Sequence, residues 1–185
     1  SALKNRLSAN FDLFRRDTKD MLTSGSQLPA TLGANAPLQN VADLKSTGFE
    51  LELAWRDQIG KVHYNIGFNL SDYQSEVTKF DNIERSLSNS YVGQKQGEIW
   101  GYETAGLFQS PDEIADAPTQ DKVSGGIQLI PGDIRFADLD GNGVIDWGDN
   151  TVDNPGDKKI IGNSTPRFHY GINLGADWKG VDFSV

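Results

Sequence analysis

The chain has 185 residues, a formal net charge of −9 and no cysteine. The acidic balance argues against nucleic acid as a partner, because neutralising phosphates requires clustered lysine and arginine. The lack of cysteine rules out disulfides and thiolate metal sites. The two histidines, His63 and His169, lie far apart in the sequence, so a zinc site or a Ser-His-Asp triad is poorly supported. We therefore expect no catalytic residues and no enzyme activity.

The first predicted element is a strand over about residues 3–15, where apolar and polar side chains alternate. Leu7, Ala9, Phe11 and Leu13 fall on one side, and the residues between them are polar. A period of two is typical of a strand with two different environments. Residues 16–47 are rich in Ser, Gly, Pro, Asn and Ala without sustained periodicity, and predict a long loop with one short extended piece near 38–41.

A hairpin is predicted next, with strands over about 48–56 and 62–78. Phe49, Leu51, Leu53 and Trp55 alternate with polar residues, and the alternation resumes at Val62 after a short turn that contains Gly60. Two alternating runs around a glycine-containing turn indicate a hairpin. The long stretch that follows, about residues 80–166, is predicted to be a loop. Within it, Ser110 followed by Pro111 and two acids predicts the start of a short helix.

A twelve-residue stretch of this loop, 138–149, matches the spacing of a calcium loop. Oxygen-bearing side chains occupy positions 1, 3, 5, 9 and 12, Gly143 stands at the sharp turn, and Ile145 can point into a core. Position 12 is Asp149 and not the usual Glu, so we expect weaker or water-assisted binding. The alternative is a surface turn rich in Asp, Asn and Gly that holds no metal. The predicted Ca²⁺ ligands, in a structural and not catalytic site, are Asp138, Asp140, Asn142, Val144, Asp146 and Asp149.

The chain ends with two further predicted strands, about 167–178 and 181–185, joined by a turn at Lys179-Gly180. The alternating runs have the length of tilted membrane strands, about nine to eleven residues, and aromatic residues stand at their ends, as at a membrane interface. The connections run long, short, long, short, as in outer-membrane barrels, where the long loops are extracellular. This favours an all-β fold of antiparallel transmembrane barrel strands over a soluble β-sandwich.

Four motifs resemble the C-terminal barrel region of SusC/RagA-type TonB-dependent outer-membrane transporters. They are Asn40-Val41 followed by STGFEL at 46–51, GYETAGLF at 101–108, PGDIRF at 131–136 running into Asp138–Asp146, and IGN at 161–163 followed by Pro166, Phe168, Tyr170-Gly171 and Asn173-Leu174. The resemblance covers nearly the whole chain. We therefore expect residues 1–185 to be part of one barrel domain, a fragment that lacks the plug, most of the barrel and the final strands.

This resemblance implies nutrient import across the outer membrane, with oligosaccharides or peptides as substrates. It also implies outer-membrane lipid around the strands, a SusD-like surface lipoprotein as partner, and TonB acting through the missing plug. Aromatic rings of the long loop are candidates for substrate stacking, although such residues more often pack a loop together; the candidates are Tyr91, Trp100, Tyr102, Phe108 and Trp147. Two other readings stay open: a soluble calcium-dependent carbohydrate-binding β module, and a surface protein with calcium-braced repeats, which the lack of a fixed repeat weakens.

Overall fold

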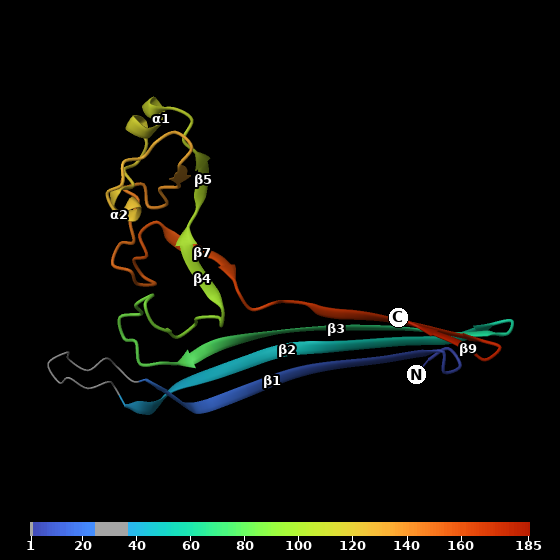
Figure 1. Cartoon of the computed structure of the whole chain (residues 1–185). Coiled ribbons are helices and arrows are strands. Elements are labelled where there is room, and N and C mark those ends of the chain that lie inside the picture. Colours follow the sequence, from blue (N-terminus) through green and yellow to red (C-terminus); the bar gives the residue numbers. More distant parts are fainter. Residues whose placement is uncertain (1, 25–36) are drawn as a thin grey trace. The chain divides into compact units, whose positions relative to one another are not determined.

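The computed structural model describes residues 2–24 and 37–185, and the chain divides into two compact units (Figure 1). The sheet unit comprises residues 1–18, 44–76 and 166–185. The loop unit comprises residues 19–43 and 77–165. In the part of the chain that the structure describes, no helix is long and apolar enough to cross a membrane.

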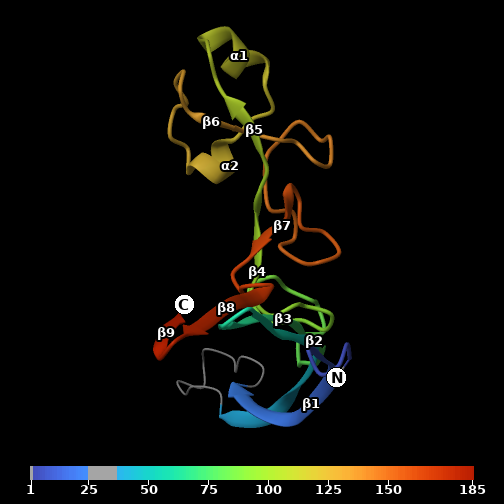
Figure 2. The same ribbon diagram turned by 90° about the vertical axis from the view of Figure 1, so that its right-hand side faces the viewer.

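A five-stranded sheet provides the framework of the sheet unit, and the ends of its three long strands continue into the loop unit. Its order is β1 (Leu7–Ser24), β2 (Leu38–Ile59), β3 (Val62–Lys79), β8 (His169–Trp178) and β9 (Val181–Ser184). β8 pairs antiparallel with both β3 and β9, and β3 and β8 lie side by side in Figure 1 and Figure 2. The prediction of an all-β, antiparallel fold is confirmed.

The register between β3 and β8 separates apolar from polar side chains. On one face Phe68 lies opposite Ile172, and Leu70 lies opposite Tyr170. On the other face asparagine and glycine alternate across the two strands, in the pairs Asn65–Gly175, Gly67–Asn173 and Asn69–Gly171. The apolar face is not covered: Tyr170 is 73% exposed and Ile172 is 59% exposed. The sheet unit therefore has two contrasting faces, as the alternation predicted.

The beginning of β8 is fixed by an ion pair with β3. The Arg167 guanidinium donates to the Asp72 carboxylate, with Nε 2.5 Å from Oδ1, and the Asp72 residue is only 7% exposed. The backbone N–H of Phe168 donates to the same oxygen at 3.4 Å. Because a bidentate guanidinium–carboxylate pair fixes direction as well as distance, it sets the point where the chain from the loop unit joins the sheet.

Two strands are longer than predicted. β1 extends to Ser24 and β2 begins at Leu38, so much of the loop predicted for 16–47 is strand; residues 25–36 of it lie outside the described residues. The added parts carry polar residues, and the Asp20 N–H donates to the Asp43 side chain at 2.8 Å. Strands can pair through their backbones without an apolar face. The alternation of apolar and polar residues therefore predicted only the parts of each strand that carry an apolar face.

The loop unit is built from short elements, where the sequence predicted a loop over 80–166. β4 (Glu98–Tyr102) pairs with β7 (Lys158–Asn163), and β5 (Thr104–Leu107) pairs with β6 (Ile134–Phe136). Two short helices follow β5, α1 (Pro111–Asp116) and α2 (Asp121–Ser124). The predicted helix start is confirmed, because the Ser110 hydroxyl accepts a hydrogen bond from the Glu113 N–H at 3.2 Å.

The loop unit has a small core of its own. Phe108, Ile145 and Asp157 are the largest fully buried side chains of the described residues, and Tyr91 is 4% exposed. Two of these four residues are aromatic and one is a charged acid, whose burial requires hydrogen-bond partners. These contacts organise the region in which the candidate site lies.

Candidate functional site

The loop at 138–149 winds around the carboxylate of its first residue. Asp138 accepts hydrogen bonds from the N–H of Gly141 at 2.7 Å and of Gly143 at 2.9 Å. The Gly143 N–H, followed by that of Gly141, lowers the pKa of the Asp138 carboxyl below its ordinary value. Gly143 has φ +82°, a conformation that a side chain would strain. Asp138 is therefore held as a carboxylate at the entrance of a tight turn.

The next polar residues of the loop repeat this pattern on a smaller scale. Asp140 Oδ1 accepts from the Asn142 N–H at 3.0 Å, and Asn142 Oδ1 accepts from the Val144 N–H at 2.7 Å. Asp and Asn side chains that bond the backbone two residues on make Asx turns, which keep a loop curled without regular structure. The Val144 carbonyl accepts no hydrogen bond from any described residue, which leaves it available as a ligand.

Ile145 fastens the loop to the rest of the unit. Its side chain is completely buried, as its position in the loop predicted. Its N–H donates to the Thr119 carbonyl at 2.7 Å, and the Thr119 N–H donates to the Gly143 carbonyl at 3.1 Å. These bonds form an isolated parallel bridge between Thr119 and Val144. The loop is thus held on a β-type contact and is not flanked by two helices.

Asp157 completes the acidic group, and the sequence interpretation missed it. One carboxylate oxygen from each of Asp138, Asp140 and Asp157 lies within 4.8 Å of the others. Asp157 is fully buried, and it accepts hydrogen bonds from the N–H of Leu139 at 2.7 Å and of Asp146 at 2.8 Å. It follows the predicted loop by eight positions, after Asn154-Pro155-Gly156. The signal that could have found it is this turn sequence, which brings the chain back to the loop.

Two predicted ligands, Asp146 and Asp149, are engaged elsewhere. Asp146 accepts from Lys122 Nζ at 2.7 Å and from the Gly148 N–H at 2.8 Å, and the Lys122 bond is the main cause that lowers the pKa of its carboxyl. The Asp149 carboxylate accepts from the Asn154 amide at 2.8 Å. Of the predicted acids, the structure therefore brings together Asp138 and Asp140, and Asp157 lies with them.

The aromatic residues predicted to stack on substrate are mostly used for packing. Phe108 is only 1% exposed, so its ring offers no surface to a ligand. The Trp100 Nε1–H donates to the Tyr91 hydroxyl at 3.0 Å. The Tyr102 ring centroid lies 5.4 Å from that of Phe136 and 5.9 Å from Lys158 Nζ. Of these four candidates, Trp147 is the one that is exposed, at 43%.

The Tyr91 hydroxyl links these aromatic residues to a carboxylate. It donates to Glu98 Oε2 at 2.6 Å while it accepts from Trp100. Burial, followed by the hydrogen bond to Glu98, raises the pKa of Tyr91 to about 12. The phenol is therefore held in its neutral, donating form, which is a structural role.

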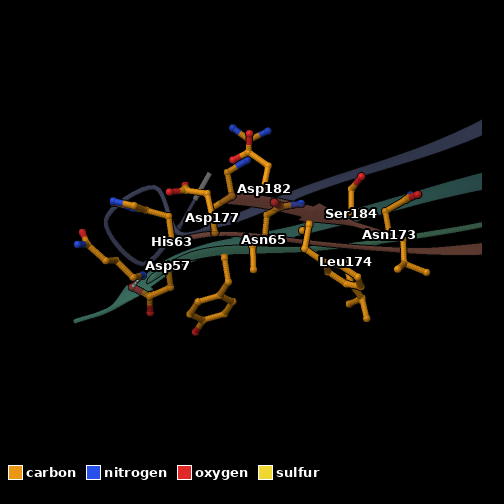
Figure 3. A pocket seen from close by; sticks show the side chains of 15 residues that line it. Asp57, His63, Asn65, Asn173, Leu174, Asp177, Asp182 and Ser184 are labelled. Carbon is orange, nitrogen blue, oxygen red and sulfur yellow. Dashed lines mark hydrogen bonds between the residues drawn. The ribbon is translucent and has the colours of Figure 1, made fainter. Parts of the chain in front are cut away.

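The polar face of the sheet unit is a second candidate surface. Asparagine amides lie over glycines of the neighbouring strand, and a Cβ added at Gly171 would stand 2.5 Å from Asn69 Oδ1. A hollow of about 970 Å³ lies at one end of the sheet, lined by polar residues of this face and also by Tyr64, Leu174 and Phe183 of the apolar face. In Figure 3 its residues Asn65, His63, Asp177 and Asp182 project to the same side, away from Leu174. The face is polar and acidic at this end.

The whole chain matches one protein family. Residues 2–184 match the family described as TonB dependent receptor-like, beta-barrel. TonB-dependent receptor P3 of Formosa agariphila is 28% identical over 195 residues, which cover 98% of this chain and 18% of that protein. TonB-dependent receptor P39 of the same bacterium is 26% identical over 209 residues, which cover 100% of this chain and 20% of that protein. The chain thus spans about a fifth of the length of these relatives.

Solved structures share the fold. The RagAB peptide transporter matches with a TM-score of 0.64 and 23% identity, over 98% of this chain and 19% of the other. The RagAB peptide importer in its open-open state matches with a TM-score of 0.66 and 22% identity, over 98% of this chain and 18% of the other. At these identities the likeness shows the fold alone.

Proposed function

Because the chain belongs to the TonB dependent receptor-like, beta-barrel family, we propose that it forms part of an outer-membrane barrel that imports nutrients. The observation that carries this proposal is the sheet with two contrasting faces. Its apolar face leaves Leu13 at 75% and Phe183 at 61% exposed, which suits contact with lipid. Its opposite face carries asparagine, glycine and acids, which suits a water-filled or plugged interior. We propose that the loop unit is extracellular.

The proposed substrates are oligosaccharides or peptides, and the transporter would move them without breaking a bond. We further propose that a SusD-like surface lipoprotein acts with the barrel and that TonB supplies energy through a plug outside this chain. The names of the RagAB neighbours, a peptide transporter and a peptide importer, support the class of cargo without fixing it.

Uptake by cells tests this function. We expect deletion of the gene for the full-length protein to abolish uptake of one labelled oligosaccharide or peptide mixture, and a plasmid copy to restore it. Uptake should also stop when a protonophore collapses the energy supply for TonB. Unchanged uptake of every tested glycan and peptide in the deletion strain would contradict the proposal.

We also propose that the loop at 138–149 binds Ca²⁺ as a structural brace. Ca²⁺ takes about six to eight oxygen ligands, and carboxylates of Asp138, Asp140 and Asp157 converge. The side-chain oxygen of Asn142 and the carbonyl of Val144 are further donors of the kind that Ca²⁺ uses. The backbone bonds that Asp157 accepts support a role for it in place of Asp149. Bound metal would tie residue 138 to residue 157 and order the loop unit.

Calorimetric titration of the chelator-treated full-length protein tests the metal site. We expect saturable Ca²⁺ binding and a higher melting temperature with Ca²⁺ than without it. The substitution Asp138→Asn should remove both effects. Asp153→Asn is the matched control, since that carboxylate is 70% exposed and pairs with Arg85 outside the acidic group. Absence of heat together with an unchanged melting temperature would reject the site.

A further inference from the structure

A hollow with aliphatic walls lies in the loop unit between α1 and the segment 128–131. Its volume is about 540 Å³, and its lining includes Pro111, Ile114, Pro118, Leu129, Ile130 and Pro131. Asp121 is its one charged lining residue. Ile130 is 60% exposed, and Ile127, which precedes the segment, is 72% exposed. When a ligand covers aliphatic surface of this kind, which is open to solvent, the burial stabilises the complex.

An acidic hollow of about 490 Å³ lies next to the aliphatic one, and the two share Ala117 and Pro118. Its acids are Asp112, Glu113, Asp116 and Asp138, and Arg135 is its one basic lining residue. The carboxylates of Asp112 and Asp116 form no hydrogen bond or ion pair with any described residue. Arg135 donates to the Ala105 carbonyl at 3.1 Å. The hollow therefore carries a net negative charge that favours a cationic ligand.

The composition of these walls distinguishes peptides from sugars. Sugar rings bind best on flat aromatic faces, but no aromatic residue lines the aliphatic hollow. The one aromatic residue that lines the acidic hollow, Phe136, packs against Tyr102, with 5.4 Å between the ring centroids. In the same unit, Phe108 and Tyr91 are buried, and Trp147, which is 43% exposed, lines neither hollow. An aliphatic side chain fits a wall of proline, isoleucine and leucine, and a lysine or arginine fits beside Asp112 and Asp116.

We propose that α1 and Pro118 form a binding site for a cationic peptide. The peptide places an aliphatic side chain in the first hollow and a lysine or arginine in the second. This inference rests on the proposed import function and narrows its cargo from glycans or peptides to peptides that combine these two kinds of side chain. We infer that the ligand of this site is peptide cargo from solution, because acidic residues lie beside an aliphatic wall.

Fluorescence anisotropy with the full-length protein in detergent tests the site directly. The probe is the peptide Gly-Ile-Gly-Lys-Gly-Ile-Gly-Lys with a neutral fluorophore. One comparison peptide has serine in place of each isoleucine, another has glutamate in place of each lysine, and labelled maltohexaose represents a neutral glycan. We expect the Ile/Lys peptide to bind at least about tenfold more tightly than each of the other three, since each comparison peptide lacks one of the two contributions and maltohexaose lacks both.

Two variants separate the contributions of the two hollows. Ile130→Ser should lower the affinity for the Ile/Lys peptide about fivefold and leave the affinity for the Ser/Lys peptide unchanged. The double substitution Asp112→Asn with Asp116→Asn should lower the affinity for both lysine peptides. This effect should shrink at about 0.5 M salt because surface charges are screened. The matched controls are Ile83→Ser and Glu84→Gln, which alter exposed residues that line neither hollow; both should bind like the wild type.

Equal affinity for all three peptides, tighter binding of maltohexaose, or insensitivity to Ile130→Ser and to the double substitution would overturn the proposal. Cellular uptake, measured in parallel, keeps this failure distinct from failure of the import function. If the protein imports a glycan but does not discriminate among the peptides, the binding site is wrong and import stands. If the peptides bind as expected but deletion of the gene leaves all uptake unchanged, the site stands and import is wrong.

Discussion

In the sheet unit the large apolar side chains lie on the surface, whereas the loop unit has buried some of its own. Tyr170 and Leu13 are 73% and 75% exposed, while Phe108 and Ile145 are 1% and 0% exposed. Exposed apolar surface is unfavourable in water and favourable in lipid. The comparison indicates that the sheet unit depends on an apolar environment to cover one face, and that the loop unit is organised around a core of its own.

The two units also differ in which groups form hydrogen bonds with their backbone N–H and carbonyl groups. In the sheet unit, neighbouring strands bond each other in a regular register. In the loop unit, side chains take over part of this role: Asp157 accepts from two backbone N–H groups, Gln120 accepts from the Phe136 N–H at 2.7 Å and donates to the Ile134 carbonyl at 3.0 Å. Order in the loop unit therefore depends on a few individual residues, and substitution of one should disturb the whole unit.

The largest expected effect is loss of the core of the loop unit in the variant Phe108→Ala. Removing a buried phenylalanine leaves a cavity and costs about 3–5 kcal/mol of unfolding free energy. The control is Leu107→Ala, because that neighbour is 50% exposed and should cost about 0.5 kcal/mol or less. Hydrogen–deuterium exchange of the loop-unit amides measures the difference. Similar protection in the two variants would show that the unit does not depend on this core.

A smaller loss is expected when a charge is placed on the apolar face of the sheet. Ile172→Arg should destabilise the folded barrel in lipid vesicles by about 2–4 kcal/mol if the residue lies near the middle of the bilayer. Asn173→Arg, one residue along β8 and on the opposite face, should have little effect. The fraction folded is measured by heat-modifiable migration on gels. Equal losses for the two variants would contradict the assignment of the two faces to lipid and interior.

Sequence reasoning predicted the sheet well because a single physical signal specifies it. Residues such as Phe168 to Trp178 alternate because two environments meet at the sheet, and this pattern needs no knowledge of distant residues. The two short turns and the helix start at Ser110 were predicted from local chemistry and are confirmed. The resemblance to TonB-dependent transporters is confirmed by the family match over residues 2–184.

The loop unit was predicted less well because its contacts are not periodic. β4 pairs with β7, which lies more than fifty residues away in the sequence. The residues of neither segment predict which strand it pairs with. Asp157 was missed for the same reason: its role depends on where Pro155 and Gly156 turn the chain. The prediction that Asp149 is the twelfth-position ligand rests on spacing alone, and spacing does not show that its carboxylate accepts a hydrogen bond from the Asn154 amide.

The smallest expected effect concerns the ionisation of Tyr91, and it reports on the same comparison. Its pKa is raised to about 12, against about 10 for an exposed tyrosine. The unfolded chain therefore loses the phenolic proton at lower pH than the folded unit does. The stability that this difference contributes is fully present below about pH 10 and is lost progressively as the pH rises toward 12. The Tyr91 hydroxyl is hydrogen-bonded to Glu98 and Trp100, which both belong to the loop unit. The loss of stability at high pH should therefore be confined to the loop unit.

The measurement is an absorbance titration of the phenolate in the wild type and in Tyr91→Phe. The difference between the two curves isolates Tyr91 from the other tyrosines, and its midpoint should lie near 12. Exchange of the loop-unit amides should quicken over the same pH range in the wild type relative to the variant, after correction for the intrinsic rate. A midpoint near 10 would mean that the phenol is accessible to water and that the Tyr91–Glu98 bond does not persist in solution. The loop unit would then be held by Phe108, Ile145 and Asp157 without the aromatic group beside β4.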